Sequence, residues 1–172
     1  THPTTPNTYT INGTSLIGNY NVGVGQTYTT LTAAVAAYNA ACLTGAVTFS
    51  LIDANYAGET FPITINANPF ASATNTLTIK PILAATTITG TAATALIVLN
   101  GADWVTVNGS ITATANTVCP AVVASRDLTL TNTNTSTASA VVWLQSTVAF
   151  DGATNNSIRN INLIGSGNTQ TF

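Results

Sequence analysis

The residues of this sequence that could carry acid–base chemistry are few and widely spaced. The 172 residues include only five carboxylates, namely Asp53, Glu59, Asp103, Asp127 and Asp151. Cleavage of a glycosidic bond needs two carboxylates about 5 to 10 Å apart across a cleft. Asp103 and Asp151 would meet that distance only if two coils of a repeating fold separated them, and nothing around them specifies a substrate. We therefore expect no enzymatic activity and no cofactor.

The single histidine and the two cysteines do not form a recognisable metal or nucleophile site. His2 lies in the opening segment THPTTPNT, which is typical of a flexible arm, so no Ser-His-Asp set is expected in a folded core. Cys42 and Cys119 do not form a Cys-x-x-Cys pair, so we expect no metal site. In an oxidising compartment these two cysteines could form a disulfide bond, and two buried free thiols are the equal alternative.

The composition excludes two classes of partner. Only 5% of the residues are charged, whereas about a quarter is usual in soluble domains. Three basic residues, Lys80, Arg126 and Arg159, cannot neutralise a nucleic-acid backbone. No apolar run approaches the roughly 18 residues of a membrane span, and no basic amphipathic segment is present. We therefore expect neither nucleic-acid binding nor membrane insertion, and a polar surface made of Thr and Asn.

Short apolar strand signals recur along the chain, most of them followed by Asn, Gly or Pro: VTFSL, ITI, LTI, LIVL, WVTV, LTLT, VVWL and NINLIG. Three sets of apolar positions share a spacing of 22 or 23 residues, apart from one step of 28: Ile65, Ile88 and Ile111; Leu99, Val122 and Leu144; Val107, Leu130 and Ile158. This common period predicts an all-β fold, a right-handed parallel β-helix with three faces and about five coils. A β-sandwich is the alternative, but it gives no reason for three sets to share one period.

One segment, YTTLTAAVAAYNAAC at residues 28–42, predicts a helix over residues 29–42 with Thr29 or Thr30 as its N-cap. Its apolar residues share one helical face: Leu31, Ala34, Val35, Tyr38 and Cys42. The first coil of a solenoid has unpaired backbone groups and an open interior, so it needs a cap. We expect the helix to be that cap; an ordinary surface helix on a mixed fold is the alternative.

The chain is expected to form one domain, with an N-terminal arm or linker at 1–27 and the β-helix with its capping helix at 28–172. Alternating apolar residues in the arm, Tyr9, Ile11, Leu16 and Ile17, have strand potential and could add a strand to a neighbouring copy. The C-terminal end has no evident cap, so an open apolar edge is predicted there, with Phe172 as a further assembly contact.

The predicted register also brings charged residues together. If Val107 stacks under Leu130, then Asp103 stacks against Arg126 as an inter-coil ion pair, which contributes under about 1 kcal/mol when partly exposed. A shift of one residue would instead stack Asp103 on Asp127, which requires a cation between the two carboxylates. We favour the ion pair.

Repeated Thr-x-Thr pairs raise a separate hypothesis, because a flat array of hydroxyl and methyl groups can order water and bind ice. The pairs are at 76/78, 87/89, 112/114 and 129/131. Such an array requires the pairs to repeat on one face. The 22 to 23 residue period assigns them to different tracks, so we do not favour ice binding.

A family resemblance adds to this interpretation. The run YTTLTAAVAAYNAACLTGAVTFSLIDANYAGETFPITI resembles the N-terminal signature of right-handed parallel β-helix proteins of the pectin-lyase-like superfamily. SATNTLTI at 72–79 and LNGADWVTVNG at 99–109 are similar to segments of large secreted and surface repeat proteins of Bacteroidota-type bacteria. The resemblance implies export, commonly by the type IX route, and a location outside the cell. It also implies that Glu59, in the turn ANYAGET, has a structural role.

These observations together predict an extracellular structural protein, a subunit of a surface filament or surface layer that assembles through β-strand and edge contacts with its own copies. The alternative is an adhesin or carbohydrate-binding module cut from a larger surface protein, with surface glycans as partners. Trp104 and Trp143 could stack on sugar rings, although their apolar neighbours favour packing in the core. An enzyme acting on polysaccharide is the third hypothesis.

Overall fold

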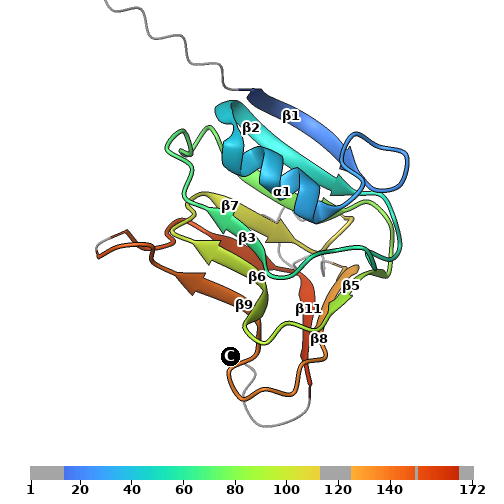
Figure 1. Ribbon diagram of the computed structural model, residues 1–172. Helices are drawn as coiled ribbons and strands as arrows, with labels where there is room; N and C mark the ends of the chain where they lie inside the picture. Colours follow the sequence, from blue (N-terminus) through green and yellow to red (C-terminus); the bar gives the residue numbers. More distant parts are fainter. Residues whose placement is uncertain (1–13, 113–124, 150, 167–172) are drawn as a thin grey trace, which may run out of the picture.

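Parallel strands and one short helix make up the fold (Figure 1). The structure, a computed structural model, describes residues 14–112, 125–149 and 151–166. Its elements are β1 (Ser15–Val22), α1 (Leu31–Ala40), β2 (Cys42–Leu51), β3 (Ile63–Asn66), β4 (Leu77–Pro81), β5 (Thr86–Gly90), β6 (Ala95–Asn100), β7 (Val105–Asn108), β8 (Leu128–Asn132), β9 (Ala140–Gln145), β10 (Ser157–Arg159) and β11 (Ile161–Gly165). The expectation of an all-β chain with a single helix is confirmed for these residues.

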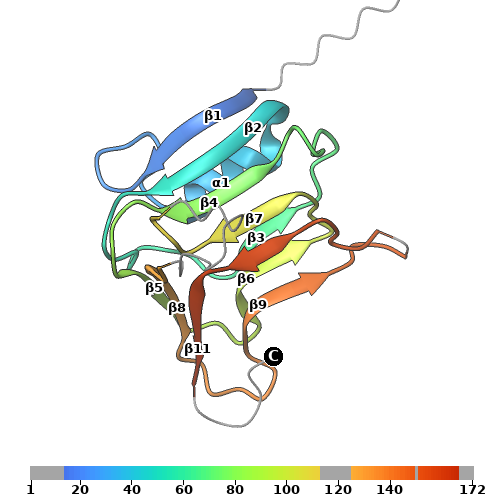
Figure 2. The same cartoon turned by 180° about the vertical axis from the view of Figure 1, so that it is seen from behind.

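The strands form three parallel sheets, which we call sheets A, B and C. Sheet A has the order β1-β2-β4-β7-β10, sheet B the order β5-β8-β11, and sheet C the order β3-β6-β9. From β4 onwards the chain visits A, B and C in constant rotation, as the two opposite views show (Figures 1 and 2). An isolated parallel bridge between Asn55 and Thr87 continues sheet B one step before β5.

Alternate residues of each strand face the interior, where partners in register stack on one another. Three inward rows run across the sheets: Phe49, Ile79, Val107 and Ile158 in sheet A; Ile88, Leu130 and Leu163 in sheet B; Ile65, Leu99 and Leu144 in sheet C. The buried members of these rows belong to one hydrophobic cluster. Large aliphatic side chains between the sheets therefore provide the core.

The predicted 22 to 23 residue period is wrong. Ile65 lies in sheet C and Ile88 in sheet B, whereas Ile111 lies beyond β7 and is 38% exposed. Leu130 pairs with Ile88 and Leu163 rather than with Val107. Two pairs that the prediction placed on one track but two coils apart, Val107 with Ile158 and Leu99 with Leu144, are direct neighbours. Val122 lies outside the described residues.

The period fails because the connections between strands differ in length. The link from β5 to β6 spans residues 91–94, whereas the link from β7 to β8 spans residues 109–127. In sheet A the successive partners Phe49, Ile79, Val107 and Ile158 are therefore 30, 28 and 51 residues apart. The strand segments were predictable, but their register was not.

The predicted helix is confirmed, with narrower bounds than 29–42. Thr30 is the N-cap, and its hydroxyl accepts a hydrogen bond from the Ala33 amide at 3.1 Å. Four of the five predicted face residues are buried on α1: Leu31, Ala34, Val35 and Tyr38. The fifth, Cys42, begins β2 instead and is half-buried. Within the described residues, no helix is long and apolar enough to span a membrane.

Part of the predicted arm belongs to the fold. Residues 15–22 form β1, which pairs in parallel with β2 of the same chain along Ser15–Val22. Leu16 is buried in the core, whereas Ile17 on the opposite face is 56% exposed. Strand potential was therefore correctly predicted for this segment, but it pairs with its own chain, so Leu16 is not available to a neighbour. Tyr9, Ile11 and Phe172 lie outside the described residues.

Candidate functional site

The two ends of the three-sheet stack differ, and the N-terminal end is covered by α1. The side chain of Asn39 on this helix donates from Nδ2 to the Thr64 carbonyl at 2.8 Å and accepts from the Asn66 amide at 3.0 Å. A neighbouring parallel strand would make the same pair of hydrogen bonds on either side of Ile65. Asn39 therefore satisfies the edge of β3, which is the first strand of sheet C.

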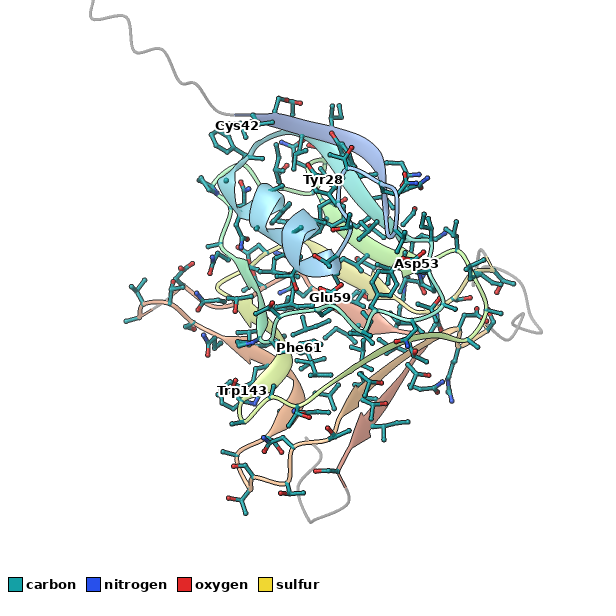
Figure 3. The ribbon with its side chains drawn as sticks, turned by 45° about the vertical axis from the view of Figure 1, so that its right-hand side comes forward. Tyr28, Cys42, Asp53, Glu59, Phe61 and Trp143 are labelled. Carbon is teal, nitrogen blue, oxygen red and sulfur yellow. The ribbon has the colours of Figure 1, made fainter. Side chains whose placement is uncertain are left out.

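The start of α1 is bonded to the segment that follows β2, and its end is bonded to the segment that follows β3. The Glu59 carboxylate accepts hydrogen bonds from the amides of Leu31 at 2.6 Å and Thr32 at 2.7 Å, at the positive end of the helix dipole. Figure 3 shows Glu59 beside this first turn. At the other terminus the Asn68 side chain donates to the carbonyls of Tyr38 and Ala41. The helix is therefore a fixed cover, as the sequence predicts for a cap.

The C-terminal end of the stack exposes apolar side chains of the inward rows. Here β9, β10 and β11 are each the last strand of their sheet in the described part of the chain. Leu144 on β9 is 55% exposed and Leu163 on β11 is 41% exposed, although their partners Leu99 and Leu130 are fully buried. We call this surface, formed by Leu144, Ile158 and Leu163 with their strand edges, the open end.

The strands of the open end carry few of the devices that usually protect sheet edges. Charged residues and proline normally prevent an edge strand from pairing with another chain. Neither β9 (AVVWLQ) nor β11 (INLIG) contains a charge or a proline, and β10 contains only Arg159. The open end is therefore chemically suited to receive further strands.

An amide ladder also runs toward the open end along sheet C. The Asn100 side chain donates to Asn66 Oδ1, and the Gln145 side chain donates to Asn100 Oδ1, both at 2.9 Å. Gln145 is the exposed last member of this ladder. Both the apolar rows and this polar row thus end on the same surface.

Three of the carboxylates accept hydrogen bonds within turns and loops. Asp53 accepts from the Val24 amide at 2.8 Å, and Asp127 accepts from the Ile111 amide at 2.9 Å and from the Ser125 hydroxyl. Asp151 accepts from the Thr147 hydroxyl at 2.5 Å. In the described ranges, no group of three or more His, Cys, Asp or Glu residues is placed to hold a metal ion.

The register that suggested an ion pair between Asp103 and Arg126 is not the observed one. Asp103 precedes β7 in sheet A, whereas Arg126 is an exposed residue just before β8 in sheet B. One carboxylate oxygen of Asp103 accepts from the amide and the hydroxyl of Thr154, at 2.6 and 2.7 Å. The disulfide between Cys42 and Cys119 remains a prediction, because Cys119 lies outside the described residues.

The sequence interpretation missed Asn39, since an amide on an otherwise Ala-rich helix resembles an ordinary surface residue. Its position next to Tyr38, on the border of the buried face, was the available signal. Comparison of the chain with protein-family models, curated proteins and solved structures found no match. Function is therefore inferred from the geometry of the two ends.

Proposed function

We propose that this chain is a right-handed parallel β-helix that acts as an extracellular structural protein, a subunit of a surface filament or layer. The constant rotation of the strands through sheets A, B and C supports the β-helix, and parallel crossovers are right-handed in nearly all proteins. The resemblance to exported surface proteins supports the location. The open end, with its half-exposed inward rows, is the observation that carries the assembly role.

The occupant proposed for the open end is the N-terminal end of a second copy. All strands of sheet A are parallel, so its two outermost strands, β1 and β10, present complementary edges to a copy displaced along the stack. Pairing of β10 with β1 of the next copy would continue one sheet through both molecules. Such a head-to-tail contact does not close on itself, so it generates a filament.

The outer face of α1 is compatible with this contact. Its exposed residues are Ala33, Ala36 and Ala40, and the helix carries no charged side chain. Because α1 covers the N-terminal end, a docked copy would bring Leu144 and Leu163 against this alanine surface. Apolar side chains would then be removed from water on both partners, which favours association.

Two variants that block opposite ends test this proposal. Leu144→Lys places a charge on the open end, and Ala36→Lys places one on the outer face of α1, where Lys is tolerated as a good helix former. Sedimentation velocity and electron microscopy should show filaments for the unmodified chain and monomers for each variant. Ile82→Lys, at an exposed apolar residue on the turn after β4, is the matched control and should still assemble.

Mixing the two blocked variants separates the head-to-tail contact from other assemblies. Each variant retains one intact end, so the mixture should form dimers that neither variant forms alone. If Ala36→Lys assembles as well as the unmodified chain, the contact does not involve α1 and the proposed arrangement is wrong. Isolated particles of the unmodified chain that bind glycans would favour the adhesin alternative.

A further inference from the structure

The outer face of sheet B carries a regular grid of threonine side chains. We call this grid the threonine face. Its members follow alternate positions of three adjacent strand segments: Thr87, Thr89 and Thr91; Thr129, Thr131 and Thr133; Asn162, Ile164 and Ser166. The strands β5, β8 and β11 lie side by side in both views (Figures 1 and 2). Six of the nine members are therefore threonines, in two neighbouring rows.

Strand register places these side chains on one face. Thr87 pairs with Thr129 and Thr89 pairs with Thr131, while the intervening Ile88 and Leu130 are fully buried. Neighbouring members are consequently about 4.8 Å apart across strands and about 6.6 Å apart along them. The sequence period had assigned these Thr-x-Thr pairs to different tracks. The observed register corrects that assignment for two of the four pairs, because 87/89 and 129/131 repeat on one face, whereas Thr78 of the pair 76/78 lies in sheet A.

Hydrogen bonds hold the hydroxyl groups of Thr91, Thr129 and Thr133 on the threonine face. Thr91 and Thr133 share a hydrogen bond of 2.5 Å between their Oγ1 atoms, and the Thr133 hydroxyl also approaches the Gly90 carbonyl at 3.1 Å. Thr129 Oγ1 accepts from the Asn162 side chain at 3.3 Å. A hydroxyl has one donor and two acceptor sites, so these groups retain capacity for water. Because threonine is β-branched, its χ1 rotation is restricted.

Charge distinguishes the threonine face from sheet A. Sheet A has one outward row of small polar residues, which includes Thr48, Thr78 and Thr106, but Lys80 and Arg159 occupy the adjacent outward positions. None of the nine members of the threonine face is charged, and none is aromatic. An aromatic side chain would be expected if the face stacked on sugar rings.

We propose that the threonine face binds ice. Its regularly spaced hydroxyl groups hold water, and the adjacent methyl groups limit the orientations that this water can adopt. The absence of charge leaves this water layer free to join the crystal. The ligand is therefore the ordered water of an ice surface. This activity is independent of the filament contact, because sheet B's outer face is distinct from the open end.

The experiment compares one variant at the centre of the threonine face with a matched variant on sheet A. Thr131, between Thr89 and Ile164, is the central member. Thr131→Tyr interrupts the grid, and Thr78→Tyr makes the same exchange in sheet A; both keep a residue that strands accept. The unmodified chain should slow ice recrystallisation and show thermal hysteresis. Thr131→Tyr should reduce both to background, and Thr78→Tyr should not change them.

Thermal unfolding followed by circular dichroism identifies any variant that fails to fold. Thr131→Val then replaces the hydroxyl with a methyl group of similar size and should reduce ice activity less than Thr131→Tyr does. An unmodified chain without effect on ice growth would overturn the proposal, as would equal losses in Thr131→Tyr and Thr78→Tyr. Binding to an insoluble polysaccharide through Thr131, without ice activity, would assign the face to glycans instead.

Discussion

Two buried tyrosines of this chain differ in the hydrogen bonding of their hydroxyl groups. Tyr38 on α1 is fully buried, and its hydroxyl has no hydrogen-bond partner among the described residues. The Tyr56 hydroxyl instead donates to the Val22 carbonyl at 2.6 Å and accepts from the Asp53 amide at 3.2 Å. Burial raises the pKa of both phenols, and the charge of Asp103 adds to the effect on Tyr38. The two residues therefore test the cost of an unpartnered polar group directly.

We expect Tyr38→Phe to leave the free energy of unfolding unchanged or to raise it by about 1 kcal/mol, because it removes a buried hydroxyl that lacks a partner. Tyr56→Phe should lower it by about 1 to 2 kcal/mol, since the Asp53 amide loses its acceptor and the Val22 carbonyl keeps only the hydrogen bond from the Ile52 amide. Urea denaturation of both variants measures the difference. A larger loss for Tyr38→Phe than for Tyr56→Phe would contradict this account.

The pKa of Tyr38 also predicts a response to alkaline pH. Burial raises it to about 12, whereas tyrosine in an unfolded chain ionises near pH 10. The folded state thus binds this proton more tightly, so its contribution to stability is complete below about pH 10 and is lost between about pH 10 and 12. Urea midpoints measured across this range should fall less steeply for Tyr38→Phe than for the unmodified chain.

At the scale of elements, the segment that follows β2 determines how firmly α1 covers its end of the stack. The Glu59 carboxylate accepts hydrogen bonds from the backbone amides of Leu31 and Thr32 at the start of the helix. Glu59→Gln should therefore lower the free energy of unfolding by about 1 to 2 kcal/mol. Amide hydrogen exchange should accelerate in the first turn of α1. Asp151→Asn, which alters a carboxylate bonded to the Thr147 hydroxyl, is the control and should change stability by less than about 0.5 kcal/mol.

The elements were largely predictable because their signals are local. Thr30 and the buried face of α1 follow from capping and from the 3.6-residue repeat, and strand segments such as LTI and LIVL follow from apolar alternation. Register was not predictable, since it depends on connections as different as 91–94 and 109–127. The sequence predicted an open C-terminal edge. Only the observed register shows that Ile158 and Leu163 lie on it.

Across the whole molecule, low charge is the dominant physical property. The chain has three basic and five acidic side chains in 172 residues. Several of its carboxylates accept hydrogen bonds from uncharged amides and hydroxyls, which salt screens little. The melting temperature should therefore change little between low salt and about 0.5 M NaCl, where the Debye length is only a few ångströms. A melting temperature that depends strongly on salt would indicate that pairs of charged side chains contribute substantially to stability.

Asn39 has a consequence for how such a molecule can vary in size. By imitating a strand with one side chain, it ends sheet C on the side of α1 without presenting a surface that another strand could extend. In the proposed β-helix, duplicated turns of the chain can be inserted behind this helix, or added beyond β11, while the helical end stays as it is. Longer and shorter versions of the molecule should accordingly share the segment from β1 to β3 and differ in the number of strands that follow.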